Sequence, residues 1–182
     1  MRCSLSLLVL FLFGIPQRAR AADSLGDRIV AFCKAHKDQQ VGDGDCYDLG
    51  KYALKEAGAR PEFKYHNNPN KGDYVWGKLV FKEEAGEGES GPKREGKVKD
   101  VRPGDVIQLR DAKFEGKKLS GKGTYRVSMP HHTAIVSAVE NDGKLLRIYH
   151  QNFGGKKVVM EATITPEHLT AGWIRIYRPN PK

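Results

Sequence analysis

Cys46 stands at the start of a predicted helix, a position that suits a reactive thiol. The residues after it carry an apolar stripe near helical spacing, Asp45 is a suitable N-cap and Gly58 is a suitable C-terminal stop. A thiol in the first turn feels the positive end of the helix dipole, which favours the thiolate, although the carboxylates of Asp43 and Asp45 oppose it. Because the thiolate is the strong nucleophile, Cys46 is the candidate for covalent catalysis.

A hairpin further along the chain is expected to bring His132, His150 and Asn152 together. The β-rich segments 132–140 and 145–151 flank an Asp-Gly turn signal. In such a hairpin the start of the first strand lies beside the end of the second. The pairing alone therefore predicts that the three side chains are neighbours.

The adjacent histidines His131 and His132 are not equivalent. Successive residues of a strand point to opposite faces, so only one of the two rings can lie on the face that meets the Cys46 helix. His132 is favoured as the general base, and His131 stays open as the alternative.

Two other chemistries could use the same residues. Cysteine and histidine are the usual zinc ligands, so Cys46, His131, His132 and His150 form a possible zinc site, although adjacent strand histidines point apart. Alternatively, Cys33 and Cys46 could form a disulfide. The competing prediction is that Cys33 lies buried and unpaired on the apolar face of the first helix.

The elements around these residues indicate an α+β fold. Helices are predicted at about 24–37 and from Cys46 onward, and the rest of the chain is rich in β signals. Segment 74–81 is a strand or a short helix, and 83–96 is a charged surface loop. Helices followed by a strand meander indicate helices packed on one side of an antiparallel sheet. The predicted strands are 106–109, 125–129, 132–140, 145–151, 157–163 and 173–177.

Four motifs, in this order, resemble the papain-like superfamily, and within it the CHAP and NlpC-type amidases and endopeptidases of bacterial cell walls. The resemblance covers about residues 42–157. The motifs are Asp45-Cys46, Pro103-Gly104-Asp105-Val106, His132-Thr133-Ala134-Ile135-Val136 and His150-Gln151-Asn152-Phe153-Gly154-Gly155.

The resemblance implies a site without metal or organic cofactor. Cys46 would be the nucleophile, His132 the general base and His150 the residue that orients His132, with Asn152 as an alternative or additional polar partner. A nucleophile, a base and an orienting group within hydrogen-bond reach is also the general pattern for covalent acyl transfer. The Cys46 backbone N–H could help to bind the oxyanion.

The start of the chain predicts export. A basic residue, an apolar run from Leu5 to Ile15 and Ala19-Arg20-Ala21 match a signal peptide over residues 1–21. The run is too short for a membrane span, so no stable membrane insertion is expected after cleavage. Residues 22–182 would then form a single domain, secreted or periplasmic.

The formal net charge of +9 constrains the partners. Lysine and arginine gather in 93–99 and 117–126, which suits a cell-wall peptide or another anionic envelope polymer. Nucleic acid is not expected, because the chain carries no recognisable binding motif for it. The protein is expected to be a monomer.

These observations predict an exported cysteine hydrolase that cleaves amide bonds, in peptidoglycan or a related peptide, through Cys46, His132 and His150. The alternative is a non-catalytic module on the same fold that binds cell-wall material or a protein.

Overall fold

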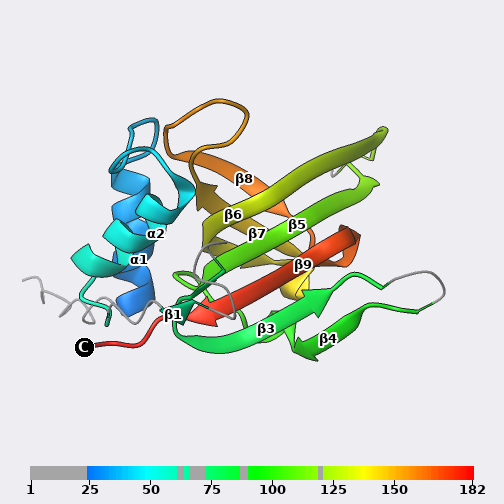
Figure 1. The fold of residues 1–182 in the computed structure, drawn as a ribbon, viewed down its shortest axis with the longest axis horizontal. Coiled ribbons are helices and arrows are strands. Elements are labelled where there is room, and N and C mark those ends of the chain that lie inside the picture. The colour runs from blue at the N-terminus through cyan, green and yellow to red at the C-terminus, as the bar shows by residue number, and fades with distance from the viewer. Residues whose placement is uncertain (1–23, 61–63, 66–72, 87–89, 119–120) are drawn as a thin grey trace, which may run out of the picture.

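The computed structural model describes residues 24–60, 64–65, 73–86, 90–118 and 121–182 (Figure 1). The predicted signal peptide lies outside these residues. The elements are α1 (Leu25–Ala35), α2 (Cys46–Glu56), β1 (Lys64–Tyr65), β2 (Tyr74–Val75), β3 (Lys78–Glu84), β4 (Lys93–Gly96), η2 (Val98–Asp100), β5 (Val106–Lys117), β6 (Thr124–Glu140), η3 (Asn141–Gly143), β7 (Leu145–His150), β8 (Met160–Ile164), η4 (Pro166–His168) and β9 (Leu169–Arg178).

Both helices begin where the sequence predicts. Ser24 and Asp27 form a reciprocal capping box, in which the Asp27 N–H donates to Ser24 Oγ over 3.1 Å and the Ser24 N–H donates to Asp27 Oδ2 over 3.0 Å. Cys46 is the first residue of α2, and its N-cap Asp45 makes no side-chain capping bond. Gly58, just after α2, has φ +79°, as expected of a C-terminal stop.

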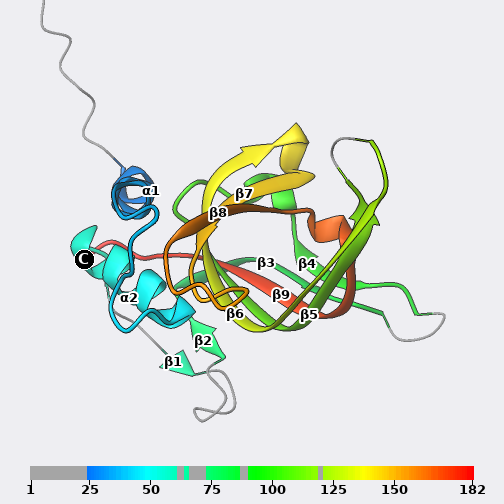
Figure 2. The same ribbon diagram turned by 90° about the horizontal axis from the view of Figure 1, so that it is seen from above.

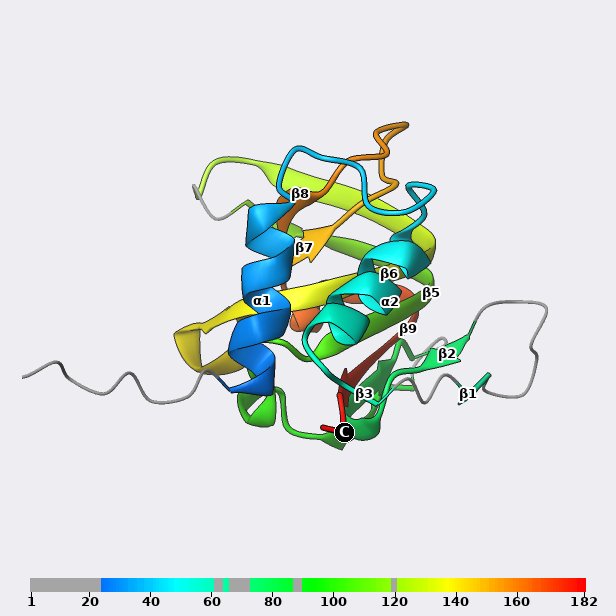
Figure 3. The ribbon, with the colours of Figure 1, turned by 90° about the vertical axis from the view of Figure 1, so that its left-hand side faces the viewer.

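Seven strands form one antiparallel sheet in the order β4-β3-β9-β5-β6-β7-β8, and β1 pairs with β2 separately. Figure 2 shows the large sheet curving round from β3 to β8. The helices lie side by side on its outer face, where α1 packs on α2 and α2 packs on β6 (Figure 3). Among the described residues, no helix is long and apolar enough to cross a membrane.

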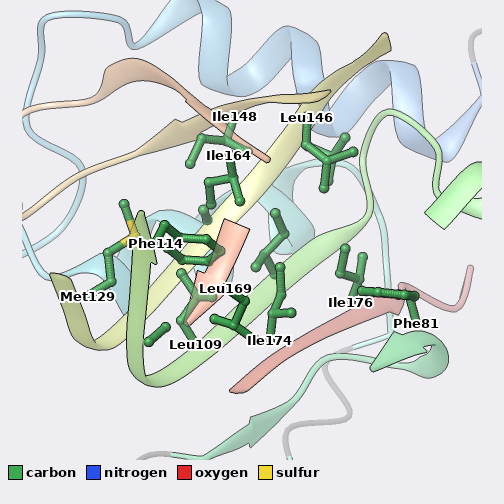
Figure 4. Packing of buried hydrophobic residues seen from close by; sticks show 14 of the residues in the cluster. Phe81, Leu109, Phe114, Met129, Leu146, Ile148, Ile164, Leu169, Ile174 and Ile176 are labelled. Atoms are coloured by element: carbon green, nitrogen blue, oxygen red, sulfur yellow. The ribbon is translucent and has the colours of Figure 1, made fainter. Parts of the chain in front are cut away.

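The predicted α+β class is wrong, because the fold is dominated by the antiparallel sheet, with two α-helices in the described part of the chain. The physical reason is the core. The curved sheet fills its concave side with its own side chains, so the main core needs no helix (Figure 4). A second cluster lies between the helices and the outer face of the sheet.

The strands β5 and β9 of the curved sheet depart from regular pairing at the same level, where each carries a residue with positive φ. The pairing of β5 with β9 shifts register between Arg110 and Lys113, where Asp111 has φ +50° and Gly172 has φ +69°. As a result, Leu109 and Ala112 both face the concave core, although regular alternation would put them on opposite faces.

The prediction of a surface loop at 83–96 is wrong for both ends of the segment. Glu83 is a buried residue of β3, and Lys93–Gly96 forms β4, which pairs with β3. Arg94 explains the difference, because its guanidinium donates to both carboxylate oxygens of Glu83 over 3.0 and 2.9 Å. A charged pair across two strands allowed a polar segment to join the sheet.

We expect Gly172→Ala to lower the free energy of unfolding by at least about 2 kcal/mol, because backbone strain and a close contact act together. An alanine Cβ would lie 2.2 Å from the Arg110 carbonyl oxygen. Urea unfolding measures the loss. The matched control is Gly154→Ala, which has a similar φ of +60° and nothing within 4 Å of its Cβ, and should lose only about 1 kcal/mol. Equal losses would contradict the role of Gly172 at the bend.

Candidate active site

His132 and His150 are brought together as the sequence predicts. His132 Nε2 lies 2.9 Å from His150 Nδ1, and the two rings meet edge to face. The pairing of β6 with β7 makes this contact possible, because Ala134 and His150 are the last pair of residues where β7 ends. Phe153 packs its ring against both imidazoles.

Both imidazoles are neutral at pH 7. Burial, with smaller contributions from the charges of His150 and His131, lowers the pKa of His132 to about 3. Burial lowers the pKa of His150 to about 4. The side chains are 3% and 2% exposed, so water does little to stabilise a charge on either ring.

The expectation that His132 lies on the face of β6 that meets the Cys46 helix is wrong, because the residues of alternate register take that face. Thr133 and Ile135 meet the helices: a Cβ on Gly50 of α2 would touch Thr133, and Ile135 belongs to the helix-side cluster. His132 shares the opposite, concave side with Ala134. The base and the Cys46 helix therefore lie on different sides of the sheet.

The thiol reaches β6 just beyond the point where the pairing of β6 with β7 ends. Val136 exchanges backbone hydrogen bonds with Asp105 and Gly104, on the β5 side, so Thr133 points its N–H to the opposite side, past the end of β7. That N–H donates to the Cys46 sulfur. In the described part of the chain the hydrogen-bond partners of the sulfur are Thr133 and Tyr47, not His132. The sulfur thus lies beside the residue that follows His132, where β6 is no longer paired with β7.

The Thr133 hydroxyl donates its proton to Gln108 and not to the Cys46 sulfur. Trp76 Nε1, which can only donate, lies 3.0 Å from Gln108 Oε1, and Thr133 Oγ1 lies 3.0 Å from the same oxygen. The hydroxyl must therefore donate to Gln108. Toward Cys46 it can only accept the S–H proton, which favours the neutral thiol.

Burial raises the pKa of the Cys46 thiol. The backbone N–H groups of Thr133 and Tyr47 lower it, and the negative charge of Asp45 raises it, as expected from the sequence. The proton therefore rests on the sulfur at pH 7, while both imidazoles are neutral.

The residues after His150 bind the loop before α2. Gln151, which the sequence analysis did not single out, bonds to the backbone of Val41 and Asp45. Asn152, predicted as a partner of His132, instead donates from Nδ2 to Asp45 Oδ1 over 3.3 Å. The strand alternation could have indicated Gln151 only as a residue facing away from His150.

Cys33 and Cys46 are both free thiols. The prediction that Cys33 is buried and unpaired is confirmed, and burial raises its pKa to about 12. Among the described residues, no group of three metal-ligating side chains is close enough to hold a metal ion. The free, half-buried Cys46 is therefore the accessible thiol of the described chain.

The family model of the AIM3/BBC1 cysteine proteinase-fold domain matches residues 17–182. The chain belongs to this family. A cysteine-proteinase type of domain, as predicted, is thus confirmed, whereas the narrower CHAP or NlpC type stays a prediction.

Two curated relatives, both from yeasts, are similar to most of this chain. Altered inheritance of mitochondria protein 3 of Debaryomyces hansenii is 28% identical over 160 residues, covering 86% of this chain and 16% of the relative. An SH3 domain-containing protein of Schizosaccharomyces pombe is 24% identical over 168 residues, covering 90% of this chain and 10% of the relative. The chain thus spans less than a fifth of either relative.

Two solved structures are also similar. The crystal structure of Ly7917 is 18% identical with a TM-score of 0.46, covering 84% of this chain and 62% of that one. The crystal structure of Ly7917 with the hydrolyzing product of MDP is 18% identical with a TM-score of 0.48, covering 85% and 63%.

The predicted secreted or periplasmic localisation is wrong. The curated relatives are named for altered inheritance of mitochondria and for an SH3 domain, and neither name is that of an exported cell-wall enzyme. The prediction depended on the composition of a short segment, residues 1–21, which lies outside the described residues.

The neutral histidine pair should make the fold sensitive to acid. Their folded pKa values lie below the ordinary 6.5, so the unfolded chain binds more protons and stability falls as the pH drops from 6.5 toward 4. Each histidine contributes up to about 1.4 kcal/mol per pH unit in this window. Urea unfolding of His150→Gln from pH 7 to 4.5 should show a shallower loss than the parent.

Ile148→Val is the matched control for this comparison. It shortens a buried side chain of the same strand and should lower stability by about 1 kcal/mol at every pH, without changing the slope. A parent and a His150→Gln variant with the same pH slope would contradict the buried neutral pair.

We expect Thr133→Val to speed alkylation of Cys46 by iodoacetamide at pH 7.5 by about fivefold, the equivalent of one neutral hydrogen bond of roughly 1 kcal/mol. The reason is that the variant removes the acceptor of the S–H proton. Thr133→Ser keeps the hydroxyl and should react like the parent. Slower alkylation of Thr133→Val would mean that the hydroxyl donates to the thiolate instead.

Proposed function

We propose that Cys46, His132 and His150 form a thiol hydrolase site that cleaves peptide amide bonds through an acyl-enzyme. The observation that carries this proposal is the 2.9 Å contact between His132 Nε2 and His150 Nδ1. It occupies one nitrogen of His132 and leaves Nδ1 for a proton from the thiol. The reaction requires the tautomer in which His132 Nε2 donates to His150.

In the proposed reaction, His132 Nδ1 takes the Cys46 proton while the sulfur forms a bond to the amide carbon. The carbonyl oxygen becomes an oxyanion, and the Cys46 N–H is the donor expected to bind it. The C–N bond then breaks, and His132 gives its proton to the leaving amine. Water cleaves the thioester, with His132 again as base, and restores the thiol.

A second candidate is a non-catalytic binding domain on the same fold. The protonation state of the site favours it, since the pKa of the thiol is raised from 9.0 and that of His132 is lowered to about 3. A site that keeps its proton on the sulfur is inert until substrate binding changes this balance. Measurement of turnover decides between the two candidates.

We expect Cys46→Ala and His132→Ala each to lower hydrolysis of a fluorogenic peptide-amide library at least about 1,000-fold, because they remove the nucleophile and the base. His150→Ala should lose less, since it orients His132 and does not touch the substrate. His131→Ala should change the rate little. Its ring lies beside Tyr74, with 6.3 Å between the ring centroids.

Folding of each variant is checked by its urea midpoint. An active His132→Ala with an inactive His131→Ala would show that the base is His131. Equal activity, or equal inactivity, of the parent and all four variants would contradict the hydrolase and favour the binding domain.

A further inference from the structure

Gln151 is fully buried, and its amide is engaged by the loop that precedes α2. Nε2 donates to the carbonyl oxygens of Val41 over 2.9 Å and of Asp45 over 2.6 Å, and Oε1 accepts from the Val41 N–H over 3.2 Å. Carbonyl oxygens can only accept, so the orientation of the amide is settled by its partners. These contacts join the end of β7 to the N-cap of the nucleophile helix.

The Asp45 carbonyl belongs to the same peptide group as the Cys46 N–H. That group is planar, so anchoring the carbonyl oxygen also sets the direction of the N–H. The carbonyl is held from a second side, because it accepts the Asp48 N–H over 3.0 Å. Cys46 is the first residue of α2, so its N–H has no acceptor within the helix and is available to an oxyanion next to the sulfur.

We propose that Gln151 is a positioning residue for acyl transfer, which aims the Cys46 N–H at the oxyanion formed when the sulfur attacks a carbonyl carbon. The inference rests on the proposed function of Cys46 as a nucleophile. Gln151 acts through the Asp45–Cys46 peptide bond. The neighbouring His150 orients the base, so two consecutive residues position the two halves of the site.

Two reactions of the same thiol separate this role from a general structural one. With p-nitrophenyl acetate, the sulfur bonds to the carbonyl carbon, an oxyanion develops, and the ester C–O bond breaks to release p-nitrophenolate. With iodoacetamide, the sulfur displaces iodide from a saturated carbon and no oxyanion develops. In both reactions the thiol proton passes to His132 or to water.

Gln151→Met keeps the length of the side chain and removes the three hydrogen bonds. We expect it to slow acylation by p-nitrophenyl acetate about 10- to 100-fold and to leave alkylation by iodoacetamide within about threefold. Gln151→Asn, which keeps the amide but shortens its reach, gives the same test if Gln151→Met does not fold. The control is Gln40→Met, an exposed glutamine of the same loop that bonds to the Gly42 carbonyl.

Loss of both reactions to the same extent would overturn the inference, because it indicates a structural role. Unchanged acylation in Gln151→Met would overturn it as well and leave the proposed function intact. A parent protein that is alkylated at Cys46 but not acylated would overturn both the inference and the proposed hydrolase.

Discussion

The site depends on the end of β7, where three consecutive side chains hold three different groups. His150 contacts the base on β6, Gln151 binds the backbone before α2, and Asn152 bonds to the N-cap side chain of Asp45. A helix packed on a sheet by apolar contacts alone can slide, because such contacts are not directional. Hydrogen bonds from one strand end to both partners fix the helix start relative to the histidine pair.

The curved sheet explains why this strand end has that role. His132 points to the concave side of β6, while α2 packs on the outer side against Thr133. A nucleophile and a base on opposite sides of a sheet can meet only where a neighbouring strand stops. β7 stops at His150, and just beyond its end the Thr133 N–H of β6 donates to the Cys46 sulfur. The position of the site therefore follows from the length of β7.

Local signals predicted the parts of this arrangement that depend on near neighbours in sequence. The helix starts and the pairing of His132 with His150 follow from capping and hairpin register. Long-range contacts decided the rest. No local pattern shows that strands far apart in sequence close their own core, or that Arg94 pairs with Glu83. Gln151 was missed for the same reason, since its partners lie 106 and 110 residues away.

The protonation of the site limits what chemistry the proposed triad can do. His150 is an imidazole, not a carboxylate, so it orients His132 without offsetting the positive charge that His132 gains as a base. On the sulfur side, two backbone N–H groups, from Thr133 and Tyr47, favour the anion. The thiolate is therefore better supported than the imidazolium. Proton transfer to His132 is then most favourable when attack on a carbonyl moves the negative charge to an oxyanion at the Cys46 N–H. Such a site would be unreactive without substrate, and the thiol would attack only when a carbonyl group is bound next to the Cys46 N–H.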